Sequence, residues 1–282
     1  MNQPAGQANT VHHGYTSNFP GPAHTIHANG NPAVAYKYST FDVVHDNGLS
    51  TNLYTSKTRL GILDRSYDAA SGAIDAIGVD NGRDKIDFAQ LVDGGSAGIV
   101  SNFVTSMATT PRNYTFMHLV EPDTQGHASG WENQAWYDSV KVIDDRLAQI
   151  FNLIDNSATL RDHTAIVLTG DHGGGVDIHT NATAYVNYNV PLFVWGGGLP
   201  AGGDLYDLSP NRFDPGLTRP DYNAVEQPWR NGDTGNLALS LLGLPPIPGS
   251  TMQPALVPEP SSAVLAAIGV FGIGCFVRRR AR

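Results

Sequence analysis

The sequence predicts an α/β fold in which helices cover a mostly parallel sheet, and three observations lead to this class. Short apolar runs end in polar turns, as strands do in α/β proteins. Longer segments repeat apolar residues at three- and four-residue steps, the period of an amphipathic helix. Residues 165–168 are apolar throughout and lead to Gly170, which is typical of a strand buried on both faces of a parallel sheet.

The first predicted unit is a helix followed by a strand. Residues 40–47 form a helix that ends at Gly48, because glycine adopts the left-handed conformation of a helix C-terminus at little cost. Residues 49–54 then form a strand. Residues 91–107 carry apolar side chains at helical spacing, although glycines at 94, 95 and 98 weaken the front half of this helix.

The second half of the chain continues the alternation. The same patterns predict a strand at 114–120, a long helix at about 132–155, strands at 165–168 and 190–195, and a helix at 233–242. The long helix has the clearest signal, since its apolar residues lie on one face. Residues 201–230 are rich in Pro, Asp and Asn and lack periodicity, so we expect a long surface loop there.

The C-terminal part divides into two further segments. Prolines at 245, 246, 248, 254, 258 and 260 predict an extended linker over residues 245–260. Residues 261–282 then contain an uncharged apolar run at 263–277 and a cluster of arginines. This run is shorter than the roughly 20 residues of a typical membrane-spanning helix. We therefore expect one globular domain over residues 1–244, a linker, and a membrane-associated tail.

Charge and cysteine content exclude several classes of function. The net charge is −9, although four arginines lie in the last five residues, and such an acidic chain is not suited to nucleic acid. The single cysteine, Cys275, lies in the tail, so the globular part has neither a disulfide nor a thiolate metal site. Any transition-metal site must therefore be built from His, Asp and Glu.

Two predicted strands are each followed by an aspartate and a histidine. Asp123 and His127 follow the strand at 114–120, and Asp171, His172 and then His179 follow the strand at 165–168. Ligands of open α/β sheets bind at the carboxyl ends of the strands. Carboxylate and imidazole donors suit zinc, and two such ions suit phosphoryl chemistry. Each pair by itself is equally compatible with a turn or a capped helix N-terminus.

The motifs around these residues resemble those of a known superfamily. Glu-Pro-Asp-x-x-Gly-His at 121–127 and Thr-Gly-Asp-His-Gly at 169–173 are similar to two signatures of the alkaline phosphatase superfamily, in its branch of type I phosphodiesterases, nucleotide pyrophosphatases and sulfatase-like hydrolases. The resemblance covers roughly residues 1–250. It implies a three-layer α/β/α sandwich and two zinc ions.

The resemblance also assigns the metal ligands. Asp123 and His127 would bind the first metal together with a later histidine, which can only be His179, the one histidine after His172. Asp171 and His172 would bind the second metal. The resemblance further implies that the reaction is hydrolysis of phosphate mono- or diesters, or of sulfate esters, with a small ester as the substrate.

The chain departs from the family pattern at its beginning. His13-Gly14 resembles the end of a family loop that normally follows the first strand, the first aspartate ligand and the nucleophilic Thr or Ser. We therefore expect a chain that lacks its first strand and its nucleophile, and whose activity is incomplete. The alternatives are a non-catalytic surface protein that keeps the fold and a partial metal site, or a phosphomutase-like member.

The tail carries a second resemblance. Val257-Pro258-Glu259-Pro260, the apolar run and the terminal arginines are similar to the PEP-CTERM sorting signal of Gram-negative bacteria. This resemblance implies an exosortase as partner and contact with the membrane through residues 263–277. It also implies export to the cell surface or extracellular matrix. No signal peptide stands at the N-terminus, and we expect it to belong to the missing front.

Overall fold

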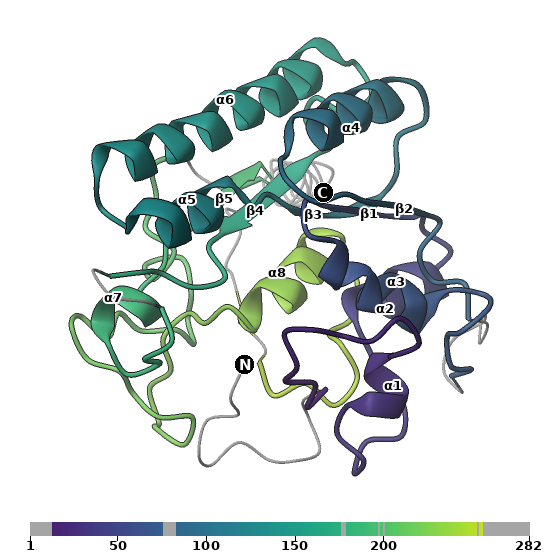
Figure 1. Ribbon diagram of the computed structural model, residues 1–282, viewed down its shortest axis with the longest axis horizontal. Helices are drawn as coiled ribbons and strands as arrows, with labels where there is room; N and C mark the ends of the chain where they lie inside the picture. Colours follow the sequence, from purple (N-terminus) through teal and green to yellow (C-terminus); the bar gives the residue numbers. More distant parts are fainter. Residues whose placement is uncertain are drawn as a thin grey trace, which may run out of the picture.

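The computed structural model confirms an α/β architecture (Figure 1). It describes residues 13–75, 83–175, 179–196, 198–199, 201–252 and 254–255. Figure 1 shows the strands in a central layer with helices on both sides. One side has α4 (Ala97–Thr109), α5 (Glu121–Ser129) and α6 (Gln134–Asn156), and the other has α2 (Thr40–Asp46), α3 (Gly61–Tyr67) and α8 (Asp233–Leu241). The short helical segments are α1 (Ile26–Asn29), the 3-10 helix η1 (Thr58–Leu60) and α7 (Tyr185–Tyr188).

A three-stranded parallel sheet forms the first part of the central layer. Its order is β2 (Phe88–Leu91), β1 (Thr51–Thr55) and β3 (Tyr114–His118). The central strand β1 is buried along its whole length. Because side chains alternate along a strand, its Leu53 and Tyr54 belong to different apolar clusters, and each is fully buried.

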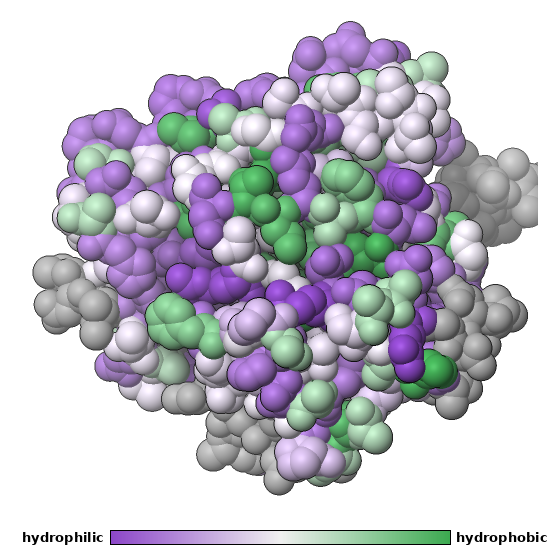
Figure 2. All heavy atoms as spheres, turned by 45° about the vertical axis from the view of Figure 1, so that its right-hand side comes forward, coloured by the Kyte–Doolittle hydropathy of each residue, from purple (hydrophilic) through white to green (hydrophobic). Residues whose placement is uncertain are grey.

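Helices α4 and α6 cover one face of this sheet. Tyr54 of β1 packs there among apolar side chains of both helices, including Ile99, Phe103 and Ile150. The edge strand β2 lies on the side that comes forward in Figure 2. There apolar side chains gather at mid-height between more hydrophilic groups above and below. The sheet therefore provides a rigid base whose three carboxyl ends meet at one edge.

The strand at 165–168 is confirmed, but its pairing differs from the prediction. β4 (Ala165–Thr169) pairs in antiparallel fashion with β5 (Leu192–Gly196) in a separate two-stranded sheet, and not within a parallel one. A parallel pair needs a crossover connection, usually a helix packed on the sheet. The described residues between β4 and β5 contain no helix other than the four-residue α7, and the chain returns in the opposite direction.

Local sequence signals set several helix boundaries. Ser39 and Asp42 form a reciprocal capping box at the start of α2, and the Asn133 side chain caps α6 by accepting a hydrogen bond from the backbone N–H of Trp136. The helix expected at 91–107 begins only at Ala97. The segment before Ala97, where the first turns of the helix were expected, is not helical, because Gly94 and Gly95 have positive φ values of 94° and 148°.

Residues 201–230 are all described by the structure and contain no helix or strand, as the sequence predicted. This loop is fastened to α8 by a buried ion pair between Arg212 and Asp233. Residues 245–252 of the expected linker contact the same helix, since Asn236 accepts a hydrogen bond from the backbone N–H of Ile247. Residues 256–282, with the sorting motif and the apolar run, lie outside the described residues. Within the described ranges no helix is both long and apolar enough to cross a membrane.

Candidate metal centre

Helix α5 carries the first two candidate ligands. It begins at Glu121, with two residues between it and the end of β3, and Pro122 in its first turn suits a helix start. Asp123 and His127 are four residues apart and therefore lie on the same face of the helix. The Nε2 atom of His127 lies 3.3 Å from Oδ1 of Asp123. The motif thus lies on a helix, whereas the sequence placed it in the polar exit of the strand.

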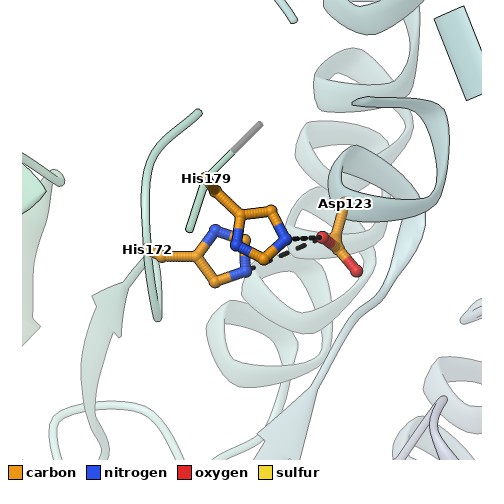
Figure 3. A group of neighbouring side chains, drawn as sticks. All are labelled: Asp123, His172 and His179. Carbon is orange, nitrogen blue, oxygen red and sulfur yellow. Dashed lines mark ion pairs between the residues drawn. The ribbon is translucent and has the colours of Figure 1, made fainter. Parts of the chain in front are cut away.

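The segment after β4 supplies two more imidazoles. His172 and His179 stack with their ring centroids 3.8 Å apart and an angle of 17° between the rings. Their Nε2 atoms lie 3.7 Å and 3.8 Å from Oδ1 of Asp123 (Figure 3). One donor atom from each of these three side chains lies within 4.8 Å of the others. The fold therefore brings residues from α5 and from the end of β4 into one cluster.

Hydrogen bonding shows how His172 presents its ring. Its Nδ1 lies 2.8 Å from the carbonyl oxygen of Gly173, and a carbonyl oxygen only accepts hydrogen bonds, so Nδ1 is the donor. In the neutral ring Nε2 then carries a lone pair that faces Asp123. Histidine ligands of metals usually donate their other N–H to an oxygen in this way. The Nε2 atom of His172 is thus arranged as a ligand.

The donor set fits a divalent metal. Oδ1 of Asp123 is buried and has no hydrogen-bond partner among the described residues, yet it faces imidazole nitrogens. A buried carboxylate oxygen without a partner is costly unless a cation or donor satisfies it. One carboxylate and two imidazoles form a donor set that zinc accepts. A cation among Asp123, His172 and His179 would satisfy all three side chains.

Lys57 holds the second oxygen of the same carboxylate. Its Nζ lies 2.6 Å from Oδ2 of Asp123 and reaches it from the carboxyl end of β1. Burial by itself raises the pKa of Asp123, but the hydrogen bond and charge of Lys57 outweigh burial and hold that pKa below its usual value. Burial, followed by the proximity of His172, lowers the pKa of His179. Both shifts favour the protonation states that metal ligands need.

The other two predicted ligands lie at the margin of the cluster. His127 is half exposed, and its Nε2 is 3.0 Å from Nε2 of His179, close enough to join the group. The Asp171 side chain is 69% exposed, and its Oδ2 is 3.7 Å from Nε2 of His172. The described residues therefore form one cluster that combines His172 with Asp123. The resemblance had divided these two ligands between separate metals.

Three supporting residues do not appear in the sequence prediction. Lys57 has a weak signal, since it stands three residues beyond the strand predicted at 49–54 and so at the same sheet edge as the ligands. Asn231 donates hydrogen bonds to the carbonyl oxygens of Gly170 and Asp171, at 3.0 Å and 2.8 Å, and so holds the exit of β4. Trp131 lies edge-to-face with His127. No sequence signal indicates the roles of Asn231 and Trp131, because their contacts depend on tertiary packing.

Comparisons with known proteins agree with this geometry. The family described as Type I phosphodiesterase / nucleotide pyrophosphatase matches residues 23–189, a range that includes β1 to β4 and the whole cluster. GPI ethanolamine phosphate transferase 1 of Saccharomyces cerevisiae is 36% identical over 92 residues, which are 31% of this chain and 9% of that protein. The protein of the same name from Gibberella zeae is 33% identical over 119 residues, 40% of this chain and 11% of that protein. The mouse protein is 29% identical over 85 residues, 30% of this chain and 9% of that protein. The chain thus spans about a tenth of the length of these relatives.

Proposed function

The chain belongs to the type I phosphodiesterase / nucleotide pyrophosphatase family, within the alkaline phosphatase superfamily, and from this premise we propose that it is a zinc-dependent hydrolase of phosphate mono- or diesters. The observation that carries the proposal is the Asp123 carboxylate. Its Oδ1 faces the Nε2 atoms of three histidines at 3.3–3.8 Å, and it has no hydrogen-bond partner among the described residues. This arrangement supports a cation site at the cluster.

The ligands have distinct tasks in this proposal. Asp123, His172 and His179 would hold the metal, and His127 lies beside them as a further donor. A divalent ion held there would supply Lewis-acid polarisation of a phosphoryl oxygen of the ester. Lys57 keeps Asp123 ionised and adds positive charge at the edge where an anionic ester would bind.

The names of the relatives and of the matched family point to two related reaction classes. The relatives are named as ethanolamine phosphate transferases, enzymes whose name indicates transfer of a phosphate-containing group. Transfer and hydrolysis differ in the acceptor, which is an alcohol in the first case and water in the second. We propose hydrolysis for this chain, because the family matched over residues 23–189 is named for phosphodiesterase and pyrophosphatase activity.

The test measures metal binding and turnover separately. The full chain is stripped with a chelator, and zinc binding is then followed by calorimetry. Asp123→Asn and His172→Ala should each weaken zinc binding by more than the roughly 10- to 100-fold that loss of an outer hydrogen-bond partner costs. The control is His163→Ala, an exposed histidine outside the cluster, which should leave zinc binding unchanged.

Turnover is measured with p-nitrophenyl phosphate, bis-p-nitrophenyl phosphate and p-nitrophenyl sulfate. Zinc-dependent release of nitrophenol from either phosphate ester supports the proposal, and release from the sulfate ester alone would move the chain to sulfatase chemistry. Zinc binding without turnover of any ester would favour a non-catalytic protein that keeps the metal site. A wild-type chain that binds no zinc overturns the assignment of the cluster.

A further inference from the structure

The turn between α5 and α6 places one large aromatic side chain beside the cluster. Gly130, Trp131 and Glu132 form this turn, and the residues on both sides of the tryptophan have positive φ, 85° for Gly130 and 59° for Glu132. A positive φ is uncommon for a residue with a side chain and persists where the surrounding structure imposes it. Asn133 ties this turn to the end of α5, because its side-chain amide donates hydrogen bonds to the carbonyl oxygens of Ser129 and Gly130.

The indole of Trp131 lies directly against two glycines, one inside the motif at 121–127 and one immediately after the motif at 169–173. A Cβ atom on Gly126 of α5 would come within 2.3 Å of the indole Cε2. A Cβ atom on Gly174, in the loop that follows β4, would come within 2.2 Å of its Nε1. Neither position accepts a side chain while the indole keeps its place. The same ring thus requires glycine both at position 126, in the first motif, and at position 174, directly after the second.

The same ring contacts two of the candidate ligands. Its centroid lies 5.3 Å from that of His127, with an angle of 72° between the rings, and 5.7 Å from that of His179, with an angle of 77°. Both are edge-to-face contacts, a favourable geometry for aromatic pairs. Trp131 therefore touches a ligand-bearing helix, a ligand-bearing loop and two imidazoles.

We propose that Trp131 is a positioning residue of the metal centre, which sets the spacing between the ligands on α5 and the ligands that follow β4. The inference rests on the proposed function, because it concerns the same metal site. Asp123 and His172 belong to separate elements. The distance between them depends on what fills the space between α5 and the glycines at 173–175, which follow β4. The indole fills that space, and its rigid ring fixes the distance.

The first test compares zinc affinity among variants of the full chain. Trp131→Leu should weaken zinc binding at least about tenfold, the loss typical of residues that orient metal ligands. Trp131→Phe keeps an aromatic edge towards both imidazoles and should restore most of the affinity. The control is Trp136→Leu on α6, whose ring contacts Tyr137 and none of the candidate ligands, and which should bind zinc like the wild type. Urea unfolding with a chelator present shows whether each variant is folded.

The second test uses the clash that the structure defines. Gly174→Ala should weaken zinc binding strongly in the wild-type background and much less in Trp131→Leu, because the atom that the new methyl group meets is then gone. Equal effects in the two backgrounds would overturn the proposal, as would a folded Trp131→Leu that binds zinc within twofold of the wild type. If Trp131→Leu does not fold, the same comparison is made in Trp131→Phe, and equal effects of Gly174→Ala there again count against the proposal. A wild-type chain without zinc binding refutes the proposed function, so the two failures are distinguishable.

Discussion

The buried ion pair between Arg212 and Asp233 offers a test of how the long loop is held to the domain. Arg212 lies in the loop at 201–230, and Asp233 is the first residue of α8. The guanidinium donates two hydrogen bonds to the carboxylate, from Nε to Oδ2 at 3.1 Å and from Nη2 to Oδ1 at 2.6 Å. The side chains are only 9% and 2% exposed. Replacement by Met in Arg212→Met removes the charge and keeps most of the length of the side chain.

The expected cost follows from the burial of the carboxylate that remains. Breaking a buried pair by removing one partner costs about 3–5 kcal/mol, because the other charge stays buried without compensation. Asp233 keeps a hydrogen bond from the backbone N–H of Arg230 at 2.8 Å and lies at the N-terminus of a helix. Both contacts stabilise the remaining charge. We therefore expect a loss near the lower end of the range, about 3 kcal/mol.

The chain contains a matched control for burial. Lys141 and Asp145 form an ion pair at 2.9 Å, but their side chains are 69% and 59% exposed. For such an exposed pair, which water and salt screen, Lys141→Met should change the stability very little. The two pairs have similar distances, so a difference between their variants measures the effect of burial.

The assay is equilibrium unfolding in urea at neutral pH with a chelator present. Arg212→Met should show a much lower midpoint than Lys141→Met, and the double change Arg212→Met with Asp233→Asn should recover part of the loss, since no buried charge remains. If Arg212→Met loses less than about 1 kcal/mol, or no more than Lys141→Met, the reasoning from burial is wrong.

Two further predictions concern the exit of β4 and a buried carboxyl group. Asn231→Asp replaces an amide that donates hydrogen bonds to the carbonyl oxygens of Gly170 and Asp171. The change should lower the free energy of unfolding in urea by about 2 kcal/mol and should weaken zinc binding. An unchanged zinc affinity would show that these hydrogen bonds do not position His172. Burial raises the pKa of Asp42 to about 6 from 3.8, so between these pH values the folded protein holds a proton that the unfolded chain has lost. The stability of the wild type relative to Asp42→Asn should therefore fall by up to about 3 kcal/mol as pH rises from about 4 to 7, and a constant difference would contradict the raised pKa.

Local patterns were enough to find most of the elements. The periodicity of residues 132–155 predicted α6, and the apolar run at 165–168 predicted β4, because burial on one or two faces leaves a direct trace in the order of side chains. The four-residue strand β2 escaped prediction because it is too short for a clear alternation. The antiparallel pairing of β4 with β5 was also not predicted, since the direction of a strand depends on the path of the chain that connects it to its neighbour.

The sequence by itself determined which polar side chains follow the strand ends. Asp123, His127, Asp171, His172 and His179 follow two strands, and strand ends converge on one edge of an α/β fold, so the polar exits already predicted a metal site. Only the tertiary structure decided which side chains meet. It grouped His172 with Asp123 and His179, and it left Asp171 exposed at the margin.

The residues that support the cluster were also decided by the tertiary structure alone. Lys57 reaches Asp123 across 66 positions of the chain, and Asn231 reaches Gly170 across 61. Trp131 meets Gly174 through the packing of a helix against a loop. Such contacts depend on how whole elements pack. A strand or a helix leaves a periodic pattern in the sequence, whereas a single contact between distant elements leaves none.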